Sequence, residues 1–473
     1  MKDNFKQASV IALKDIQLQT ALDRGTTRAV LGRIAAMAET TDAKALRQQG
    51  ARARERALNK LPELLEKLEA NVIKHGGKVL WARDGAEANA LVLQICKDND
   101  VKRVSKAKSM VAEEIDLAHA LGAHGIESTE SDLGEYIIQL ADEKPSHIVF
   151  PVLHKTKEKV AEVLHDKINM PMTDDPEQMT RFVRGVMRRK YIEADLGISG
   201  VNFAIAETGT IVTVENEGNN RLSAGTPRIH VAVMGLEKVI ENMEDFATLV
   251  QLLPRSATGQ RMTVYTSLMT GPKRDNEDDG PEQFYLVILD NGRSRILGTE
   301  YAEALKCIRC GACLNVCPVY QNIGGHAYGS VYPGPIGAVF SPLLSGVSNM
   351  PSLPHASSLC GACQSACPVD IAIPDMLLKL RRDLVQEGGQ GIGWRVGMRL
   401  WQIGMQSPTL YKLGGWAAKV ATNLIQNKHG QITKVPPPFS GWTDYRDFKP
   451  FARESFRERY KKRKPSAKGM SRL

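Results

Sequence analysis

Two short cysteine runs restrict this chain more than any other feature. In the first run, Cys307, Cys310, Cys313 and Cys317 have the spacing C-x2-C-x2-C-x3-C and are followed by Pro318. In the second run, Cys360, Cys363 and Cys367 are followed by Pro368, and Ser357 stands where the first cysteine of the pattern would be. The two runs contain seven of the eight cysteines, and only Cys96 lies apart.

The complete run has the spacing of bacterial ferredoxins, in which three neighbouring thiolates bind one cubane iron–sulfur cluster and the fourth binds the other cluster of a pair. If the last cysteine of each run binds the cluster held by the other run, two ligand sets follow. Cluster 1 takes Cys307, Cys310, Cys313 and Cys367, and cluster 2 takes Cys317, Cys360 and Cys363. The second cluster then lacks a fourth cysteine.

Structural zinc and disulfides are the alternatives to iron. Zinc favours pairs of C-x2-C or Cys/His ligands around one tetrahedral ion, which does not explain two C-x3-C-P endings. Disulfides would require an oxidising compartment and a secretory signal. The spacing therefore favours iron–sulfur clusters.

Hydrophobic periodicity divides the 473 residues into several parts. Residues 1–75 predict a helical segment, because Leu58, Leu61, Leu65 and Leu68 recur at helical spacing. In residues 76–297, apolar runs predict strands at 79–82, 148–152, 211–214, 229–233 and 285–289. Helices are predicted between them at 87–95, 111–121 and 133–141, and this alternation predicts an α/β domain with a largely parallel sheet.

The part that contains the cysteines is predicted to be mainly helical, over residues 298–390. A short helix at 300–306 leads into the first run, and Pro374 opens a helix with Leu377, Leu380 and Leu384 along one face. Residues 318–359 contain six glycines and six prolines, which predicts an irregular loop. Residues 391–473 predict a C-terminal helical segment with a basic tail.

The net charge of +9 lies almost entirely in that tail. Residues 446–473 contain 11 Lys/Arg and 3 Asp/Glu, a local charge of +8, so no nucleic-acid partner is expected. The tail could contact anionic lipid or an acidic partner, or be solvated. The sequence has no signal peptide and no membrane-spanning stretch, which predicts a cytoplasmic protein, with peripheral contact at the inner face of the membrane left open.

The sequence contains no recognisable set of catalytic residues, and the candidates for small-molecule binding are weak. The best candidates are the turn at 206–210 and the polar segment Asn219-Asn220-Arg221. The turn, with Thr208 and Gly209, could expose N–H groups to an anion, and Arg221 could hold a carboxylate or phosphate. An ordinary hairpin with a polar loop explains the same residues. Neither G-x-G-x-x-G nor G-x-x-x-x-G-K-[ST] occurs. Lys106, Lys108 and the segment 132–135 are expected to be solvated helix starts, or at most to line a site.

The segments Asp132-Leu-Gly-Glu135 and Glu207-Thr-Gly-Thr210 resemble the LUD (lactate utilization) domain. A LUD domain followed by a two-cluster ferredoxin module and a short C-terminal domain resembles the lactate utilization protein B family, over nearly the whole chain. The resemblance implies an α/β fold similar to sugar-phosphate isomerase and CoA-transferase-like domains, and two [4Fe–4S] clusters with seven matching cysteine ligands. It also implies L-lactate oxidation to pyruvate with two companions, a cysteine-rich iron–sulfur protein and a smaller LUD protein.

The fourth ligand of cluster 2 stays open between water, Ser357 and His355. Because a hydroxyl or water holds iron less firmly than a thiolate, we expect cluster 2 to convert from [4Fe–4S] to [3Fe–4S] on oxidation before cluster 1 does.

The sequence alone is compatible with several functions. The chain could be the electron-transfer component of a lactate-oxidising complex, or an iron–sulfur subunit of a different 2-hydroxy-acid oxidising system. It could instead be a self-sufficient enzyme whose α/β domain binds the hydroxy acid and passes electrons to the clusters. It could also be a redox-sensing binding protein. Two linked centres make a relay, which favours electron transfer, while the electron acceptor stays open.

Overall fold

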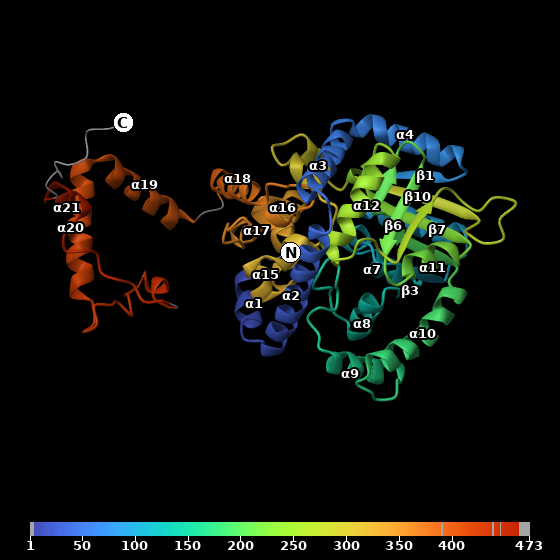
Figure 1. Cartoon of the computed structure of the whole chain (residues 1–473), viewed down its shortest axis with the longest axis horizontal. Helices are drawn as coiled ribbons and strands as arrows, with labels where there is room; N and C mark the ends of the chain where they lie inside the picture. The colour runs from blue at the N-terminus through green and yellow to red at the C-terminus, as the bar shows by residue number, and fades with distance from the viewer. Residues whose placement is uncertain (1–3, 389–390, 438, 445, 463–473) are drawn as a thin grey trace. The chain divides into compact units, whose positions relative to one another are not determined.

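The computed structural model describes residues 4–388, 391–437, 439–444 and 446–462 (Figure 1). The chain divides into two compact units, residues 1–389 and residues 390–473, which are treated separately below.

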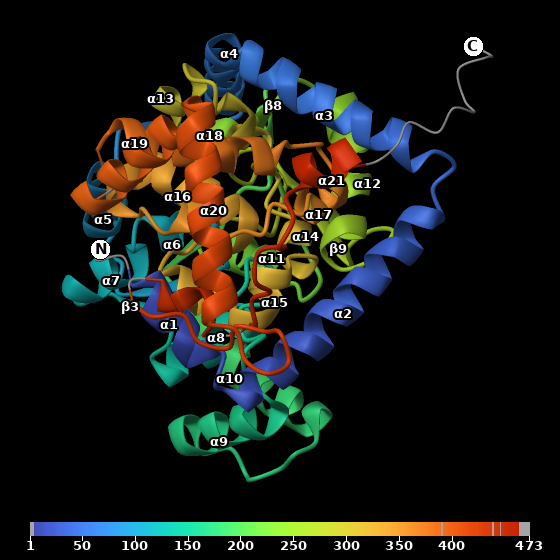
Figure 2. The ribbon, with the colours of Figure 1, turned by 90° about the vertical axis from the view of Figure 1, so that its left-hand side faces the viewer.

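Four helices open the first unit: α1 (Phe5–Ala12), α2 (Ile16–Ala38), α3 (Ala43–Asn59) and α4 (Leu61–Lys74). The side chains of Asp15 and Asp42 accept hydrogen bonds from backbone N–H groups in the first turns of α2 and α3, which fixes where these helices begin. The predicted leucine stripe on α3 and α4 is buried. Figure 2 shows α2 and α3 as two long successive helices.

The α/β part contains a six-stranded parallel sheet in the order β1-β10-β7-β4-β2-β3. Its strands are β1 (Lys78–Ala82), β2 (Arg103–Lys106), β3 (Glu127–Glu130), β4 (Leu196–Gly200), β7 (Ile229–Gly235) and β10 (Gln283–Leu289). A smaller sheet has the order β8-β5-β6-β9, from β5 (Phe203–Ile205), β6 (Thr210–Glu215), β8 (Val239–Ile240) and β9 (Tyr265–Met269).

The remaining elements of this part are helical: α5 (Gly85–Asp98), α6 (Met110–Glu114), α7 (Leu117–Ala123), α8 (Leu133–Ala141), α9 (Lys157–Ile168), α10 (Pro176–Glu193), α11 (Asn219–Gly225), η1 (Leu236–Lys238), α12 (Met243–Ala257) and α13 (Arg293–Leu297).

Alternation along the strands produces the layers. On β7, Val231 and Val233 pack with α5, α6 and α7, whereas Ala232 and Met234 pack with α4 and one face of the small sheet. The other face of the small sheet, including Phe203 and Ile205 from β5, packs in the core that contains the cysteine runs. The small sheet therefore lies between the parallel sheet and the cysteine-containing part.

That part is helical, as predicted. It consists of η2 (Ala302–Lys306), α14 (Ala312–Asn315), α15 (Pro318–Ile323), η3 (His326–Tyr328), α16 (Gly334–Ser345), η4 (Val347–Asn349), η5 (Leu353–His355), α17 (Ala362–Ala366) and α18 (Ile373–Gln386). An α/β domain followed by a mainly helical ferredoxin-type part is thus confirmed as the fold class.

Three predictions about local structure were wrong. Residues 318–359 contain two α-helices, because Pro318 and Pro335 stand in the first turns of α15 and α16, where no N–H donor is needed. Residues 148–152 form a turn rather than a strand, since the His147 ring nitrogen Nδ1 accepts the N–H groups of Val149 and Phe150. The helix predicted at 111–121 is divided into α6 and α7 at Asp116, whose φ is 53°.

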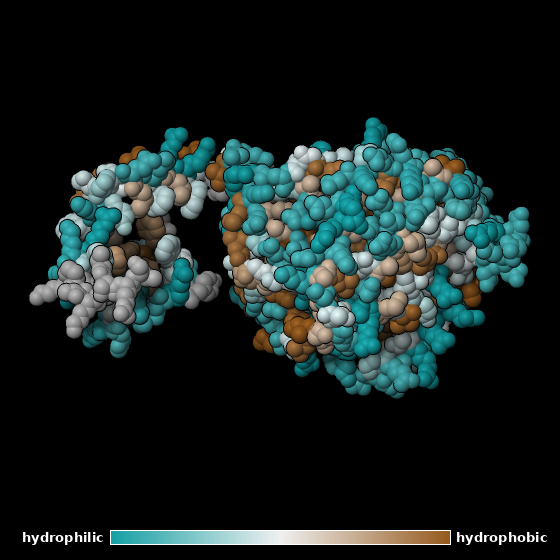
Figure 3. All heavy atoms as spheres, turned by 45° about the horizontal axis from the view of Figure 1, so that its top comes forward, coloured by the Kyte–Doolittle hydropathy of each residue, from teal (hydrophilic) through white to brown (hydrophobic). Residues whose placement is uncertain are grey.

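The second unit contains α19 (Ile392–Gln406), α20 (Pro408–Leu424), η6 (Ser440–Trp442) and α21 (Phe456–Lys462), and α19 packs against α20. The basic tail predicted at 446–473 includes α21, while residues 463–473 lie outside the described residues. Figure 3 shows mostly hydrophilic side chains on the visible face of the larger unit. Among the described residues, no helix has the length and hydrophobicity needed to span a membrane.

A buried ion network joins the α/β part to the first cysteine run. Glu237 of η1, which is 1% exposed, accepts a hydrogen bond from Arg293 Nε at 2.7 Å and a weaker one from Arg309 Nη2 at 3.5 Å. Arg293 also donates two hydrogen bonds to Glu114, at 2.9 and 2.7 Å. Burial acts to raise the pKa of Glu237, but the positive charges of Arg293, Lys238 and Arg309 lower it to about 2.

The buried Arg54 of α3 completes this junction. Its guanidinium donates to the carbonyl oxygens of Val239 at 2.9 Å and Leu305 at 3.0 Å, and also to that of Glu237. One side chain therefore connects η1, β8 and the segment that leads into Cys307.

We expect Arg293→Met to lower the free energy of unfolding of the protein by about 3 kcal/mol or more, because it leaves two buried carboxylates without their main partner. The matched control is Arg295→Met, which changes an exposed arginine of the same helix and should alter stability by no more than about 0.5 kcal/mol. Denaturant unfolding followed by circular dichroism measures both. Equal stability of the two variants would contradict the role given to the network.

Candidate iron–sulfur centre and adjoining cavity

Packing of α14 against α17 brings the two cysteine runs together. Cys307, Cys310 and Cys313 line a small cavity with Cys367, which comes from the second run. Apolar side chains form the rest of the wall, including Ile148, Ile308, Ile336, Val369, Ile371 and Ile373. The four sulfur atoms are near enough to influence one another's pKa.

The other three cysteines form a second group. Cys317 of the first run influences the pKa of Cys363, and it is itself influenced by Cys360. Cys317 and Cys363 are buried, whereas Cys360 is exposed. The two groups have the same members as the crossed ligand sets predicted from the spacing.

The two runs share a local backbone geometry. Arg309 and Gly311, on either side of Cys310, have φ values of 60° and 72°, and Leu359 and Gly361, on either side of Cys360, have values of 57° and 81°. This left-handed conformation is rare for arginine and leucine, so its repetition indicates a shared constraint on how the loop folds.

Ser357 is oriented like the cysteine that it replaces in the pattern. The backbone N–H of Leu359 donates to Ser357 Oγ at 3.1 Å, as the N–H of Arg309 donates to Cys307 Sγ at 3.4 Å. His355, the other predicted candidate, is exposed, and its pKa is lowered by burial of part of its ring and by Arg381.

The sulfur groups fit iron–sulfur clusters. Burial raises the pKa of Cys363 and of Cys367 to about 11, so these side chains need a cation beside them to remain thiolates. Backbone N–H groups point at the sulfurs, for example those of Val369 and Ile371 at Cys367. Hydrogen bonds of this kind are usual around cluster sulfurs and tune the reduction potential.

Cationic side chains surround the first sulfur group. Arg47 donates to the Cys367 carbonyl oxygen at 2.9 Å, and the charge of Arg33 acts on Cys310 and Cys367. Arg54, Lys238 and Arg309 interact electrostatically with Cys307. This positive charge would offset the negative charge of thiolate-ligated iron in the interior.

A larger cavity of about 290 Å³ lies directly beside the first group. Ile148 and Arg309 line both cavities. Its wall is otherwise formed by the α/β part, namely residues 108–111, 132, 149–150, 200–202, 214–217, 219–220, 238, 253–254, 257–258 and 263.

The charged groups of this cavity are of both signs. Lys108, Lys238 and Arg309 are basic, and Asp132, Glu215 and Glu217 are acidic. Burial and the Asp132 charge raise the pKa of Glu217 to about 7. Burial and the charge of Arg309 lower the pKa of Lys238 to about 8, although Glu237 acts in the opposite direction.

The anion-binding residues predicted from the sequence lie elsewhere. The turn at Gly209, whose φ is 68°, packs against α4, where the Asn71 amide donates to the carbonyl oxygens of Ala206 and Glu207. Thr208 donates to the hydroxyl of Thr210 at 2.8 Å, and the exposed Arg221 lies over the Tyr265 ring. None of Thr208, Gly209 and Arg221 lines the 290 Å³ cavity, and the structure does not bring the turn and Arg221 together there. Their role in binding an anion stays a prediction.

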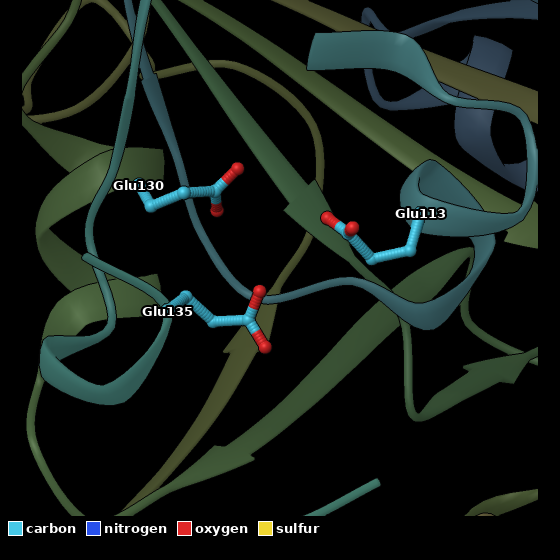
Figure 4. A group of neighbouring side chains, drawn as sticks. All are labelled: Glu113, Glu130 and Glu135. Carbon is cyan, nitrogen blue, oxygen red and sulfur yellow. The ribbon is translucent and has the colours of Figure 1, made fainter. Parts of the chain in front are cut away.

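The expectation that Lys106 is solvated was wrong. Its ammonium is fully buried and donates to Glu113 at 2.6 Å and to Glu130 at 2.8 Å. Lys108 pairs with Glu135 at 2.8 Å. Figure 4 shows that Glu113, Glu130 and Glu135 turn their carboxylates toward one shared space. Because the lysines occupy that space, the group is an internal ion-pair network.

Asn219 and Asn220 of the predicted polar segment line the cavity, whereas sequence reasoning missed Lys238 and Arg309. The only local signal was the charged pair Glu237-Lys238 directly after an apolar strand, together with an arginine inside the cysteine run. Their shared position depends on contacts between segments that are far apart in the sequence.

Three family models match successive parts of the chain. Residues 65–289 match the LUD domain, residues 303–371 match a 4Fe-4S dicluster domain, and residues 383–465 match the C-terminal region of lactate utilisation protein B.

Curated relatives cover almost the whole chain. Lactate utilization protein B of Bacillus pumilus (strain SAFR-032) is 45% identical over 461 residues, which is 97% of each chain. The protein of the same name from Bacillus subtilis (strain 168) is 42% identical over 467 residues, 98% of this chain and 97% of that one. A solved DUF162 family protein from Deinococcus radiodurans covers 48% of this chain at 12% identity, with a TM-score of 0.29. A likeness this weak indicates nothing about the function of the chain. The chain belongs to the lactate utilization protein B family.

Proposed function

We propose that this protein is the iron–sulfur electron-transfer component of a multi-subunit complex that oxidises L-lactate to pyruvate. The observation that carries the proposal is the contrast between the two sulfur groups. In the first group three of the four cysteines are buried and the group adjoins the 290 Å³ cavity, whereas in the second group Cys360 is exposed. One group is thus placed beside a site for a small molecule, and the other where a partner protein can approach.

We propose the ligand sets that the sequence predicted. Cys307, Cys310, Cys313 and Cys367 hold one [4Fe–4S] cluster, and Cys317, Cys360 and Cys363 hold the other. When bound, such clusters accept and release single electrons. The matching position of the Leu359 N–H supports Ser357 as the fourth ligand of the second cluster.

The proposed partners are two companion subunits, a cysteine-rich iron–sulfur protein and a smaller LUD protein, and the electron acceptor is left open. The division into residues 1–75, 76–297, 298–390 and 391–473 is retained as a proposal. The basic tail is a proposed contact with an anionic membrane surface or an acidic partner, since its charge of +8 comes from 11 Lys/Arg and 3 Asp/Glu.

The function is tested by lactate-dependent reduction. Protein purified anaerobically with its companions should contain iron and sulfide for two clusters, and L-lactate should decrease its visible absorbance. Glycolate, a different 2-hydroxy acid, is the comparison. Stoichiometric zinc without sulfide, or reduction by glycolate but not by L-lactate, would contradict the proposal.

Crossed ligation predicts which cysteine variants resemble one another. Cys367→Ser should perturb the same spectroscopic centre as Cys310→Ser, although the two residues lie in different runs. Cys317→Ser should instead resemble Cys363→Ser. Electron paramagnetic resonance of the reduced proteins makes the comparison, with Cys96→Ser as the control that leaves both centres unchanged. The opposite pairing of spectra would refute the ligand sets.

The position of Ser357 predicts the order in which the clusters are damaged. The second cluster should lose iron first on controlled oxidation, because a hydroxyl holds iron less firmly than a thiolate. Ser357→Cys should slow formation of the [3Fe–4S] paramagnetic signal, whereas Ser365→Cys, an exposed position in the same run, should not. The proposed position would be contradicted if the first cluster lost iron earlier, or if the [3Fe–4S] signal formed at equal rates in both variants. The iron without a cysteine ligand would then not lie at Ser357.

A further inference from the structure

The 290 Å³ cavity contains buried polar groups that have no partner in the described part of the chain. Lys238 is 7% exposed and lines the cavity, and among the described residues its ammonium makes no hydrogen bond or ion pair. Arg309 Nη1 and Asn220 Oδ1 are also buried without a hydrogen-bond partner, and both residues line the same cavity. Buried charges are normally paired, so these three groups indicate a bound molecule.

Other buried cations nearby are satisfied. Lys106 and Lys108 pair with glutamates, Arg293 pairs with Glu114 and Glu237, and Arg54 donates to backbone carbonyl oxygens. Glu237 precedes Lys238 in the chain, but its carboxylate is held by Arg293 and Arg309. Lys238 differs from these four cations, since its ammonium has no such partner among the described residues.

Arg309 is held in place before any ligand arrives. Its guanidinium lies 4.1 Å from the centroid of the Phe340 ring and 4.6 Å from that of Tyr332, and its Nη2 donates to Glu237. These contacts fix the side chain and leave Nη1 free. A preorganised guanidinium beside a lysine is well suited to bind a carboxylate, because little side-chain freedom is lost on binding.

Acidic side chains in the cavity wall limit the charge of the ligand. Asp132, Glu215 and Glu217 would repel a second negative group, while their oxygens can accept a hydrogen bond from a hydroxyl. Apolar side chains between the charged groups, such as Ile148, Phe150 and Leu253, favour an organic molecule over inorganic phosphate.

We propose that this cavity binds a small monocarboxylate, whose carboxylate pairs with Lys238 and Arg309. Its hydroxyl donates to Asn220 Oδ1 or to an acidic side chain, whereas the keto oxygen of a 2-oxo acid accepts from the Asn220 amide N–H. The choice of a 2-hydroxy or 2-oxo acid rests on the proposed function, whereas the position of the site rests on the buried groups. The ligand would lie beside the first sulfur group, because Arg309 lines both cavities.

Calorimetric titration of the cluster-containing protein tests the site with L-lactate, pyruvate, the neutral analogue lactamide and inorganic phosphate. L-Lactate and pyruvate should bind, and lactamide and phosphate should bind at least about tenfold more weakly. Lys238→Met should weaken carboxylate binding about tenfold or more, as expected for loss of a charge-assisted hydrogen bond. Lys238→Arg should retain binding to within about tenfold, and Lys97→Met, which changes an exposed lysine of α5, should match the wild type.

Iron content and the visible spectrum must be the same in Lys238→Met and the wild type for the comparison to hold. Wild-type affinity in that variant, or failure of both carboxylates to bind at millimolar concentration, would overturn the site. Loss of iron in Lys238→Met would also overturn it, since Lys238 would then serve the cluster. Lys238-dependent binding without lactate-dependent reduction would support the site and contradict the proposed function.

Discussion

Glu237 lies at the junction on which the arrangement of the first unit depends. Its carboxylate is shared by Arg293 from the end of the α/β part and Arg309 from the first cysteine run, and its carbonyl oxygen accepts a hydrogen bond from Arg54. Burial of these charges is unfavourable unless all of them are paired, so the helices, the small sheet and the cysteine run must meet in one arrangement. Because Arg309 lines both cavities, its pairing with Glu237 also places the 290 Å³ cavity beside the first sulfur group.

The surplus of positive charge at this junction suits an anionic centre. Arg33, Arg47, Arg54, Lys238 and Arg309 surround the first sulfur group, and Glu237 offsets only part of their charge. Positive charge near a cluster favours its reduced, more negative state and so raises its reduction potential. The second group has the exposed Cys360, so the two clusters would have different surroundings and different potentials.

Local signals in the sequence predicted much of the structure. The helix predicted at 133–141 is present as α8, and Asp132 caps its first turn. The two sulfur groups have the members that the cysteine spacing predicted, while their ligation of iron stays a prediction. The many prolines and glycines of residues 318–359 led to the wrong prediction of an irregular loop, since a proline in the first turn of a helix does not disrupt that helix. The segment 219–221 was a site candidate, but the cavity itself could not be predicted, because Lys238 and Arg309 reach Asn220 only through the packing of distant segments.

The central claim is that the crossed cysteine sets hold two clusters and that the first lies beside the cavity. A crystal structure of the anaerobic protein, with an anomalous difference map recorded at the iron absorption edge, tests it most directly. Two iron peaks should appear, one enclosed by Cys307, Cys310, Cys313 and Cys367 next to Arg309, and one at Cys317, Cys360 and Cys363. A single peak, or two peaks each bound by cysteines of one run alone, would contradict the account.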